Sequence, residues 1–333
     1  MNLFVYVGPH PVHAAWAGSV NARFLYFRIF RSSYLDLVEH RSRLFRAGRK
    51  RAARAMIAYL FPKGDVVLCE GGTPLVESSL AKGNRGKMLL IAADPTFYQL
   101  HSMKGTEKEY WKSLLEEIDG VIAVSELAES DVKAHTSCPV GIVYPYADVK
   151  RYTSVRSDLG STRIVFLGWH TLYKGVDLLL SAFKIVRREV NDAELFVLGD
   201  GPLRRWVLNQ NIKGVRAPGY ASRPEEFFSR ASVYLHPARY DPFPVAVIEA
   251  MCSGLIPIIT ENVGSKEIVQ KVYDRLIVKT QPKEIAERVI EVLNRPLKDK
   301  MHLSSMAMEE AKQFTKERSL AQFTKAFKTI LSS

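Results

Sequence analysis

The sequence predicts an α/β fold of two domains, each with an open parallel sheet covered by helices. Its 333 residues exceed what one ordinary core accommodates and suit two domains of roughly 150 residues. Short apolar runs alternate with helical patterns, which is typical of parallel strands joined by crossover helices. A polar stretch without a strong period, residues 146–161, separates two series of such runs.

Each series of apolar runs supplies the strands of one sheet. The first comprises residues 3–7, 66–69, 88–92, 121–124 and 141–144, and the second comprises 163–167, 194–198, 233–236 and 256–260. Helical patterns at 176–190 and 245–252 fit between strands of the second series. Because open α/β sheets bind ligands at the carboxyl ends of their strands, two such sheets facing across a cleft would suit a reaction of two substrates.

These patterns set the domain boundaries that we expect. An N-terminal domain covers residues 1–150 and a C-terminal domain covers 151–312. Residues 313–333 form a final helix, and its pattern leaves open whether it packs back on the N-terminal domain.

Composition and charge narrow the class of protein. A net charge of +12 calls for an anionic partner such as phosphate groups, nucleic acid or a lipid surface. Three distant cysteines, Cys69, Cys138 and Cys252, form neither a metal-ligand spacing nor a disulfide framework, which favours a reducing cytoplasm. No apolar run approaches the roughly 20 residues that span a bilayer, and the N-terminus does not resemble a signal peptide.

Residues 41–60 indicate a basic amphipathic helix. Phe45, Ala52, Met56 and Tyr59 follow a helical period, while arginines and a lysine cover the remaining surface. Such a helix can lie on an anionic membrane, so we expect a cytoplasmic protein with peripheral contact at the inner face. A core-packed helix with a solvated charged face fits the pattern equally well.

Two carboxylates, Asp241 and Glu249, lie eight positions apart in the most informative stretch of the chain. Phe243, Pro244 and Val245 stand where a helix begins, and the helical pattern then runs through Glu249. A helix N-terminus offers free backbone N–H groups and the positive end of the helix dipole, which suits a diphosphate. A capping Asp and a surface Glu fit this pattern equally well.

This stretch resembles the signature of family 4 glycosyltransferases, in which Glu-x7-Glu is followed by Ala-Met and a Gly-x-Pro turn. Here the match is Asp-x7-Glu, so the side chain of Asp241 reaches one methylene less far. The resemblance implies the GT-B fold, with two Rossmann-like domains. It also implies that Glu249 binds ribose hydroxyls, while Asp241 faces the transferred sugar.

Further motifs of the C-terminal half follow in the family's order. The run from Gly168 to Lys174-Gly175 resembles the loop and helix start that bind the donor diphosphate, with Lys174 as the cation. The family has an Arg directly after the first Gly, and this chain has Trp169 there; Arg239 is a candidate replacement.

Two other segments resemble the part of the family's site near the base. They contain Gly199, in the turn Gly-Asp-Gly-Pro, and Arg216, which opens the next strand and loop. Ordinary turns explain either segment taken alone.

The N-terminal half matches more loosely. Gly18 stands where the family often has a glycine loop beside the acceptor, and Asp94 stands at or next to a family His that faces the cleft. Asp94 is a candidate for binding the acceptor or the sugar, and a capping Asp before Pro95 is as good an explanation.

The function that the resemblance implies is a retaining, metal-independent transfer of a hexose from a nucleotide diphosphate sugar. The expected catalytic residues are Lys174, Asp241 and Asp94, with no metal and no cofactor. The expected acceptor is a glycan, a lipid-linked molecule or a small molecule, and nucleic acid is not expected as a partner. An inactive GT-B partner subunit and a nucleotide-sugar epimerase of the same fold stay open as alternatives.

Overall fold

The computed structural model describes residues 3–6, 10–24, 64–70 and 82–333. The chain divides into two compact units. Unit 1 consists of Met1–Val124, Ala128–Val143 and Leu320–Ser333, and unit 2 consists of Ser125–Leu127 and Tyr144–Ser319. Residues 41–60, for which we predict a basic amphipathic helix, lie outside the described residues.

Unit 1 contains a six-stranded parallel sheet of order β2-β1-β3-β4-β5-β6. Its strands are β1 (Leu3–Tyr6), β2 (Arg23–Phe24), β3 (Gly64–Glu70), β4 (Lys82–Ala92), β5 (Gly120–Ala123) and β6 (Val140–Ile142). Its helices are α1 (Pro11–Ser19), α5 (Thr96–Leu100), α6 (Gly105–Leu115) and most of α7 (Glu126–Lys133). Leu68, Leu90 and Ile122 are fully buried, as expected for central strands of a parallel sheet.

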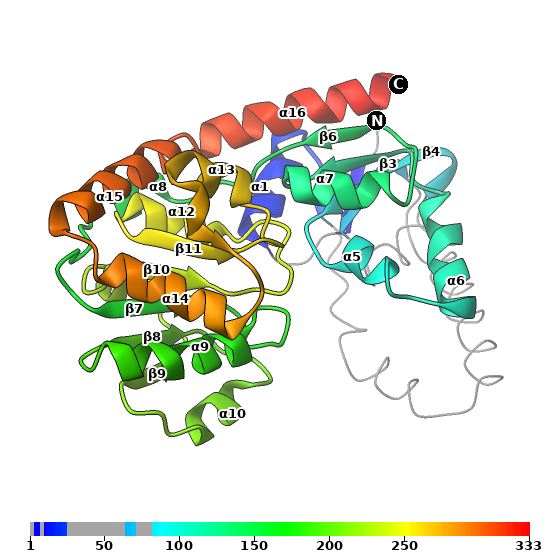
Figure 1. Ribbon diagram of the computed structural model, residues 1–333. Coiled ribbons are helices and arrows are strands. Elements are labelled where there is room, and N and C mark those ends of the chain that lie inside the picture. The colour runs from blue at the N-terminus through cyan, green and yellow to red at the C-terminus, as the bar shows by residue number, and fades with distance from the viewer. Residues whose placement is uncertain (1–2, 7–9, 25–63, 71–81) are drawn as a thin grey trace. The chain divides into compact units, whose positions relative to one another are not determined.

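The final helix, α16 (Lys316–Ser332), packs on the first sheet from Leu320 onward (Figure 1). Phe323 stacks on Trp16 of α1 with ring centroids 5.5 Å apart. A Cβ atom on Gly120 would lie 2.1 Å from Cγ2 of Ile330, so the absence of a side chain lets the helix approach β5.

Unit 2 contains a second six-stranded parallel sheet, of order β12-β11-β10-β7-β8-β9. The strands are β7 (Arg163–Leu167), β8 (Glu194–Leu198), β9 (Val215–Gly219), β10 (Val233–His236), β11 (Ile256–Thr260) and β12 (Ile277–Val278). The two parallel sheets with their helices confirm the predicted α/β fold.

Helices pack in pairs around this second sheet. They are α8 (Val149–Thr153), α9 (Val176–Glu189), α10 (Arg204–Asn209), α11 (Glu225–Phe228), α12 (Val245–Cys252), α13 (Lys266–Val272), the 3-10 helix η2 (Asp274–Leu276), α14 (Pro282–Leu293) and α15 (Leu297–Ala311). Helix α9 packs beside α14, and α12 packs beside α15 (Figure 1). Strand β7 lies between β8 and β10, so the strand order reverses beside it. A ligand site is expected at such a switch point, outside the carboxyl ends of the strands.

Candidate functional site

Three polar side chains meet at the carboxyl ends of β7 and β10. Lys174 lies in the loop between β7 and α9, His236 is the last residue of β10, and Asp241 lies in the loop before α12. Nζ of Lys174 donates to Oδ2 of Asp241 at 2.5 Å. Nε2 of His236 lies 2.8 Å from the same oxygen. The structure therefore brings together Lys174 and Asp241, both predicted from the sequence, and adds His236.

A glycine makes the approach of Lys174 to Asp241 possible. Helix α9 begins after Gly175, whose φ of 68° is in the left-handed region that favours glycine. A Cβ atom at this position would lie 1.8 Å from the carbonyl oxygen of Pro237. Only glycine therefore lets the start of α9 lie against the chain that leaves β10.

The backbone of Asp241 is fixed by the loop after β11. Its N–H donates to the carbonyl of Asn262 at 3.1 Å, and its own carbonyl accepts from the N–H of Gly264 at 2.8 Å. Asp241 and Val263 form an isolated parallel bridge. These bonds fix the backbone of Asp241, whereas its carboxylate contacts Lys174 and His236.

The side chain of Asp241 is a buried anion. Only 3% of it is exposed, against 30% for the side chain of Lys174. Burial by itself raises the pKa of Asp241, but the Lys174 ammonium and the hydrogen bond from His236 outweigh burial and hold this pKa at about 2. Burial also lowers the pKa of His236, although Asp241 opposes that shift. At neutral pH the site therefore holds an ionised Asp241 and a neutral His236.

Helix α12 begins four residues after Asp241. Phe243 and Pro244 are buried, Pro244 is the N-cap, and Val245 is the first helical residue. The first backbone N–H groups of a helix carry the positive end of its dipole, and here that of Val247 donates to the carbonyl of Pro244 at 3.0 Å. Together with the Lys174 ammonium, they give this edge of the sheet a positive potential suited to a phosphate group.

Glu249 lies about one turn along α12, next to Tyr152 of α8. The carboxyl group is largely buried, and burial raises its pKa to about 7, although a hydrogen bond with Tyr152 and the charge of Arg151 oppose the increase. The pKa of Tyr152 is itself raised by burial. A ligand hydroxyl in this position would therefore meet a carboxyl group that titrates near neutral pH.

Gly168 and Gly199 place the loops after β7 and β8 in direct contact. Gly199 has a φ of 118°, and a Cβ atom there would lie 2.0 Å from the carbonyl oxygen of Gly168. The N–H of Gly168 donates to the carbonyl of Leu198 at 3.1 Å. Both glycines thus lie at the carboxyl edge, as predicted. Trp169 follows directly and is 57% exposed.

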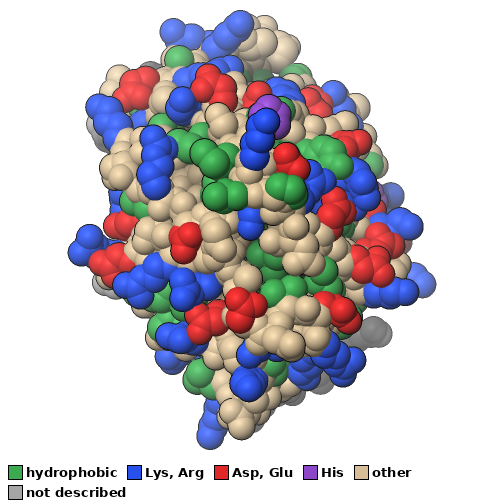
Figure 2. Space-filling model, turned by 60° about the vertical axis from the view of Figure 1, so that its left-hand side comes forward, with side chains coloured by type: hydrophobic (Ala, Val, Ile, Leu, Met, Phe, Trp, Pro, Cys, Tyr) green, Lys and Arg blue, Asp and Glu red, His purple; other side chains and the backbone are tan. Residues whose placement is uncertain are grey.

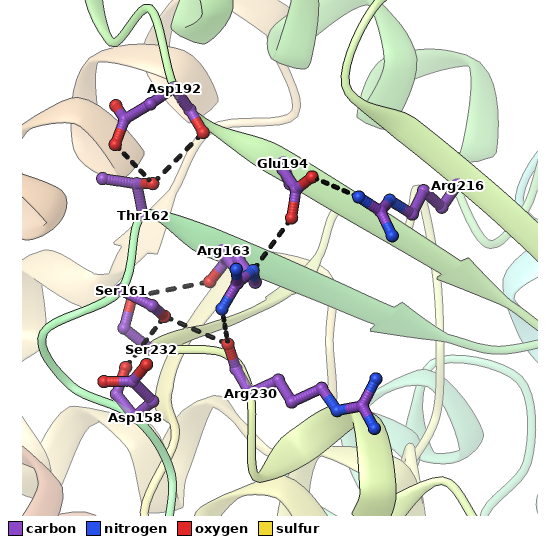
Figure 3. A network of polar contacts seen from close by, with 9 residues as sticks. All are labelled: Asp158, Ser161, Thr162, Arg163, Asp192, Glu194, Arg216, Arg230 and Ser232. Atoms are coloured by element: carbon purple, nitrogen blue, oxygen red, sulfur yellow. Dashed lines mark hydrogen bonds and ion pairs between the residues drawn. The ribbon is translucent and has the colours of Figure 1, made fainter.

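The structure does not bring Arg216 to this edge. Arg216 and Arg163 both bind Glu194, at 2.7 Å and 2.8 Å, in a polar network near the amino ends of β7 and β8 (Figure 3). Arg239 forms two hydrogen bonds with the carboxylate of Asp177, at 2.7 Å and 2.6 Å. Arg239, the candidate for the second diphosphate cation, is therefore paired with Asp177, and Arg216, expected near the base, is paired with Glu194.

The two candidates of the N-terminal half lie in unit 1. The carboxylate of Asp94, after β4, accepts from the N–H of Thr96 at 3.0 Å, and burial raises its pKa. Asp94 thus binds the first residue of α5 from the position before the N-cap, Pro95, close to the capping role that the sequence offered as an alternative. Gly18 lies in the last turn of α1, so the expectation of a loop at this residue is wrong.

His236 is the residue that the sequence analysis missed. It ends an apolar strand five residues before Asp241, and a polar residue at the carboxyl end of a buried strand is the signal that points to it. Apolar periodicity does not reveal it, because in the pattern of residues 233–236 it marks only the end of the strand.

Two surface properties of the described residues bear on partners. On the face in Figure 2, Lys and Arg side chains are spread among Asp and Glu rather than gathered in one patch. In the part of the chain that the structure describes, every helix is too short or too polar to cross a membrane.

Comparisons with known structures agree with this fold. The chain aligns over its full length with the structure of sucrose-phosphate synthase from Thermosynechococcus elongatus, at a TM-score of 0.73 and 14% identity, covering 100% of both chains. The structure of Anabaena HepE in complex with UDP and glucose gives a TM-score of 0.72 at 13% identity and covers 99% of this chain and 100% of that one. The fold is thus GT-B, as predicted.

The sequence family is identified for the segment that carries the site. Residues 153–317 match the model of the family "Glycosyl transferases group 1", which confirms the resemblance seen in the sequence. Over 164 residues the chain is 26% identical to the 2-deoxystreptamine N-acetyl-D-glucosaminyltransferase of Niallia circulans; this match covers 46% of the chain and 39% of that enzyme. The matches to curated relatives cover 27% to 39% of those relatives' own lengths.

Proposed function

We propose that this protein is a glycosyltransferase that moves a hexose from a nucleotide diphosphate sugar to an acceptor hydroxyl, with retention of configuration and without a metal ion. The observation that carries the proposal is the cluster of Lys174, Asp241 and His236 beside the start of α12. The match of residues 153–317 to group 1 glycosyltransferases supports it.

The cluster has the charges that this reaction needs. When the bond between the anomeric carbon and the phosphate oxygen breaks, negative charge gathers on the leaving diphosphate. The Lys174 ammonium and the N–H groups of α12 stabilise that charge, which is commonly the largest single contribution to catalysis. The acceptor oxygen forms the new bond to the same carbon, on the same face, and gives its proton to the leaving phosphate oxygen. Asp241 orients the sugar through its hydroxyl groups.

The donor's remaining parts fit the same edge of the sheet. Glu249 accepts hydrogen bonds from the ribose, about one helical turn from the phosphate end. The loops at Gly168 and Gly199 contact each other at the carboxyl ends of β7 and β8, and we assign their backbone groups to the donor. UDP is our first choice of nucleotide, because Anabaena HepE, which has a similar fold, was solved in complex with UDP and glucose.

The acceptor is proposed by class only. The relative from Niallia circulans is named for glycosylating 2-deoxystreptamine, and glycan, lipid-linked and small-molecule acceptors all fit our proposal. We place Asp94 and Gly18 of unit 1 on the acceptor side. Peripheral membrane contact through residues 41–60 and a cytoplasmic location remain part of the proposal.

The test is a thermal-shift panel of UDP, GDP, ADP and their hexose conjugates. A ligand that binds only the folded protein raises its melting temperature. We expect one nucleotide series to stabilise the wild type and to lose most of that effect in Lys174→Ala, each protein being compared with its own ligand-free melting temperature. Lys184→Ala, at an exposed position of α9, is the matched control and should keep the full shift.

An inactive partner subunit is the second candidate function. Trp169 favours it, because this residue stands where the family has a phosphate-binding Arg. If no nucleotide stabilises the wild type, this candidate replaces the enzyme. Release of nucleoside diphosphate from the stabilising donor, unchanged by added EDTA, would instead support a metal-independent enzyme.

A further inference from the structure

The side chain of His236 has no role in the proposed transfer as described so far, although it contacts Asp241 directly. It is 1% exposed, and its ring lies between two aromatic rings of the second sheet. Phe166 stacks at 6.0 Å with an interplanar angle of 18°, and Tyr234 at 6.2 Å with 11°. These neighbours fix the plane of the imidazole.

The hydrogen bond to Asp241 also fixes the tautomer. An ionised carboxylate only accepts hydrogen bonds, so Nε2 of the neutral ring must be the atom that carries the proton. Nδ1 is buried and has no hydrogen-bond partner among the described residues, which is consistent with an unprotonated nitrogen. His236 is therefore a single N–H donor aimed at Oδ2 of Asp241.

Lys174 and His236 share this one oxygen, but their surroundings differ. The Lys174 side chain is 30% exposed and can turn to an arriving phosphate, whereas His236 is enclosed in the sheet. A phosphate that attracts the ammonium weakens the bond between Lys174 and Asp241. The hydrogen bond from His236 then becomes the side-chain interaction that keeps the buried carboxylate in its orientation.

We propose that His236 is a positioning residue, which holds Asp241 toward the donor sugar while Lys174 is engaged with the diphosphate. The inference rests on the proposed function and deepens it by separating two tasks. Lys174 serves the diphosphate, and the His236–Asp241 pair serves the sugar. Removal of the N–H donor should therefore reduce turnover of the sugar donor and spare the affinity for the nucleoside diphosphate.

Three substitutions separate the hydrogen bond from the packing. His236→Phe keeps a ring between Phe166 and Tyr234 but has no donor. His236→Gln places an amide N–H at nearly the reach of Nε2, whereas His236→Asn places it at the shorter reach of Nδ1. If the ring has only a structural role, His236→Phe should lower kcat least. If His236 positions Asp241 through its N–H group, His236→Gln should lower kcat least.

The experiment measures donor turnover and nucleoside diphosphate affinity for these variants. We expect kcat for the sugar donor to fall roughly 10- to 100-fold in His236→Phe and His236→Asn, as for a lost hydrogen bond to a buried charge. His236→Gln should recover most of the loss. The thermal shift caused by the stabilising nucleoside diphosphate of the UDP, GDP and ADP panel should stay at the wild-type size in all three variants.

Two results would overturn the inference. One is a folded His236→Phe with wild-type kcat, and the other is a ¹⁵N NMR spectrum of the wild type that places the proton on Nδ1 of His236. A wild type that none of the nucleotides stabilises would instead count against the proposed function, so the two failures are distinguishable.

Discussion

Asp241 and Glu249 are both largely buried carboxyl groups, yet their pKa values lie at about 2 and about 7. The difference comes from their neighbours. Asp241 meets an ammonium group and an imidazole N–H, which favour the ionised form, whereas burial dominates at Glu249. Asp241 is therefore ionised at neutral pH, whereas Glu249, eight positions later, titrates near neutral pH.

Glu249 should make the stability of the protein depend on pH. Its pKa rises from an ordinary value of 4.5 in the unfolded chain to about 7 in the folded one. The folded state therefore binds the proton more tightly, and the resulting stability is present below pH 4.5 and lost as the pH rises through 7. We expect Glu249→Gln to remove about 3 kcal/mol of this pH dependence, measured by urea unfolding between pH 5 and pH 8.

A matched change elsewhere isolates this effect. Glu189→Gln, at an exposed position of the last turn of α9, should leave the pH dependence of unfolding as in the wild type. Equal slopes for wild type and Glu249→Gln would contradict the prediction.

The same titration bears on donor binding. In the proposed donor complex Glu249 accepts ribose hydroxyls, and it does so fully only when ionised, so affinity for the nucleoside diphosphate should increase as the pH rises through about 7. Isothermal titration calorimetry at pH 6 and pH 8 measures this affinity. The Glu249→Gln variant lacks the titrating carboxyl group, so its affinity should be low and should lack this increase with pH. A wild-type affinity that falls over the same interval would speak against Glu249 as the ribose acceptor.

At the scale of elements, the site depends on the start of α9. Gly175→Ala places a side chain in the left-handed region and 1.8 Å from the Pro237 carbonyl, so the loop that carries Lys174 must move. We expect a loss of about 2–4 kcal/mol in the free energy of unfolding and a large loss of the nucleotide-induced thermal shift.

The control for this substitution is Gly160→Ala. Gly160 is outside the left-handed region, and the nearest atom to an added Cβ is an Asp158 carboxylate oxygen at 3.4 Å, an ordinary contact. Its stability should change little. If Gly175→Ala proves as mild as Gly160→Ala, the glycine does not place Lys174 in the way we describe.

At the scale of the whole molecule, the end of the chain completes the first unit. Phe323 is fully buried against Trp16, and Phe327 stacks on it at 5.8 Å. Phe323→Ala should cost about 3–5 kcal/mol. The loss should appear in unit 1, with faster amide hydrogen exchange in β5 and β6, while β10 and β11 of unit 2 keep their protection.

Lys325→Ala is the neighbouring control for α16. Lys325 is exposed on the same helix, so its replacement should leave exchange in both units unchanged. Equal acceleration of exchange in β10 and β5 by Phe323→Ala would show that the two units do not unfold separately.

The sequence by itself determined the α/β fold, because buried parallel strands leave continuous apolar runs such as 163–167 and 256–260 that match the observed strands. It did not reveal β2 and β12, since a strand of two residues has no period. The family resemblance pointed to the segments that carry Lys174 and Asp241. This was possible because each family motif is a short stretch of sequence within one loop and the helix that follows it.

Only the tertiary structure decided which side chains meet. Lys174 and His236 both bind Oδ2 of Asp241 because the carboxyl ends of β7 and β10 lie together, although the two residues are 62 positions apart in the chain. The binding of Arg216 to Glu194 near the amino ends of the strands and the packing of α16 on unit 1 are likewise long-range facts. Hydrophobic periodicity in the sequence indicates which face of a helix or strand is buried. Which side chains come into contact depends on the order of the strands in the folded sheet.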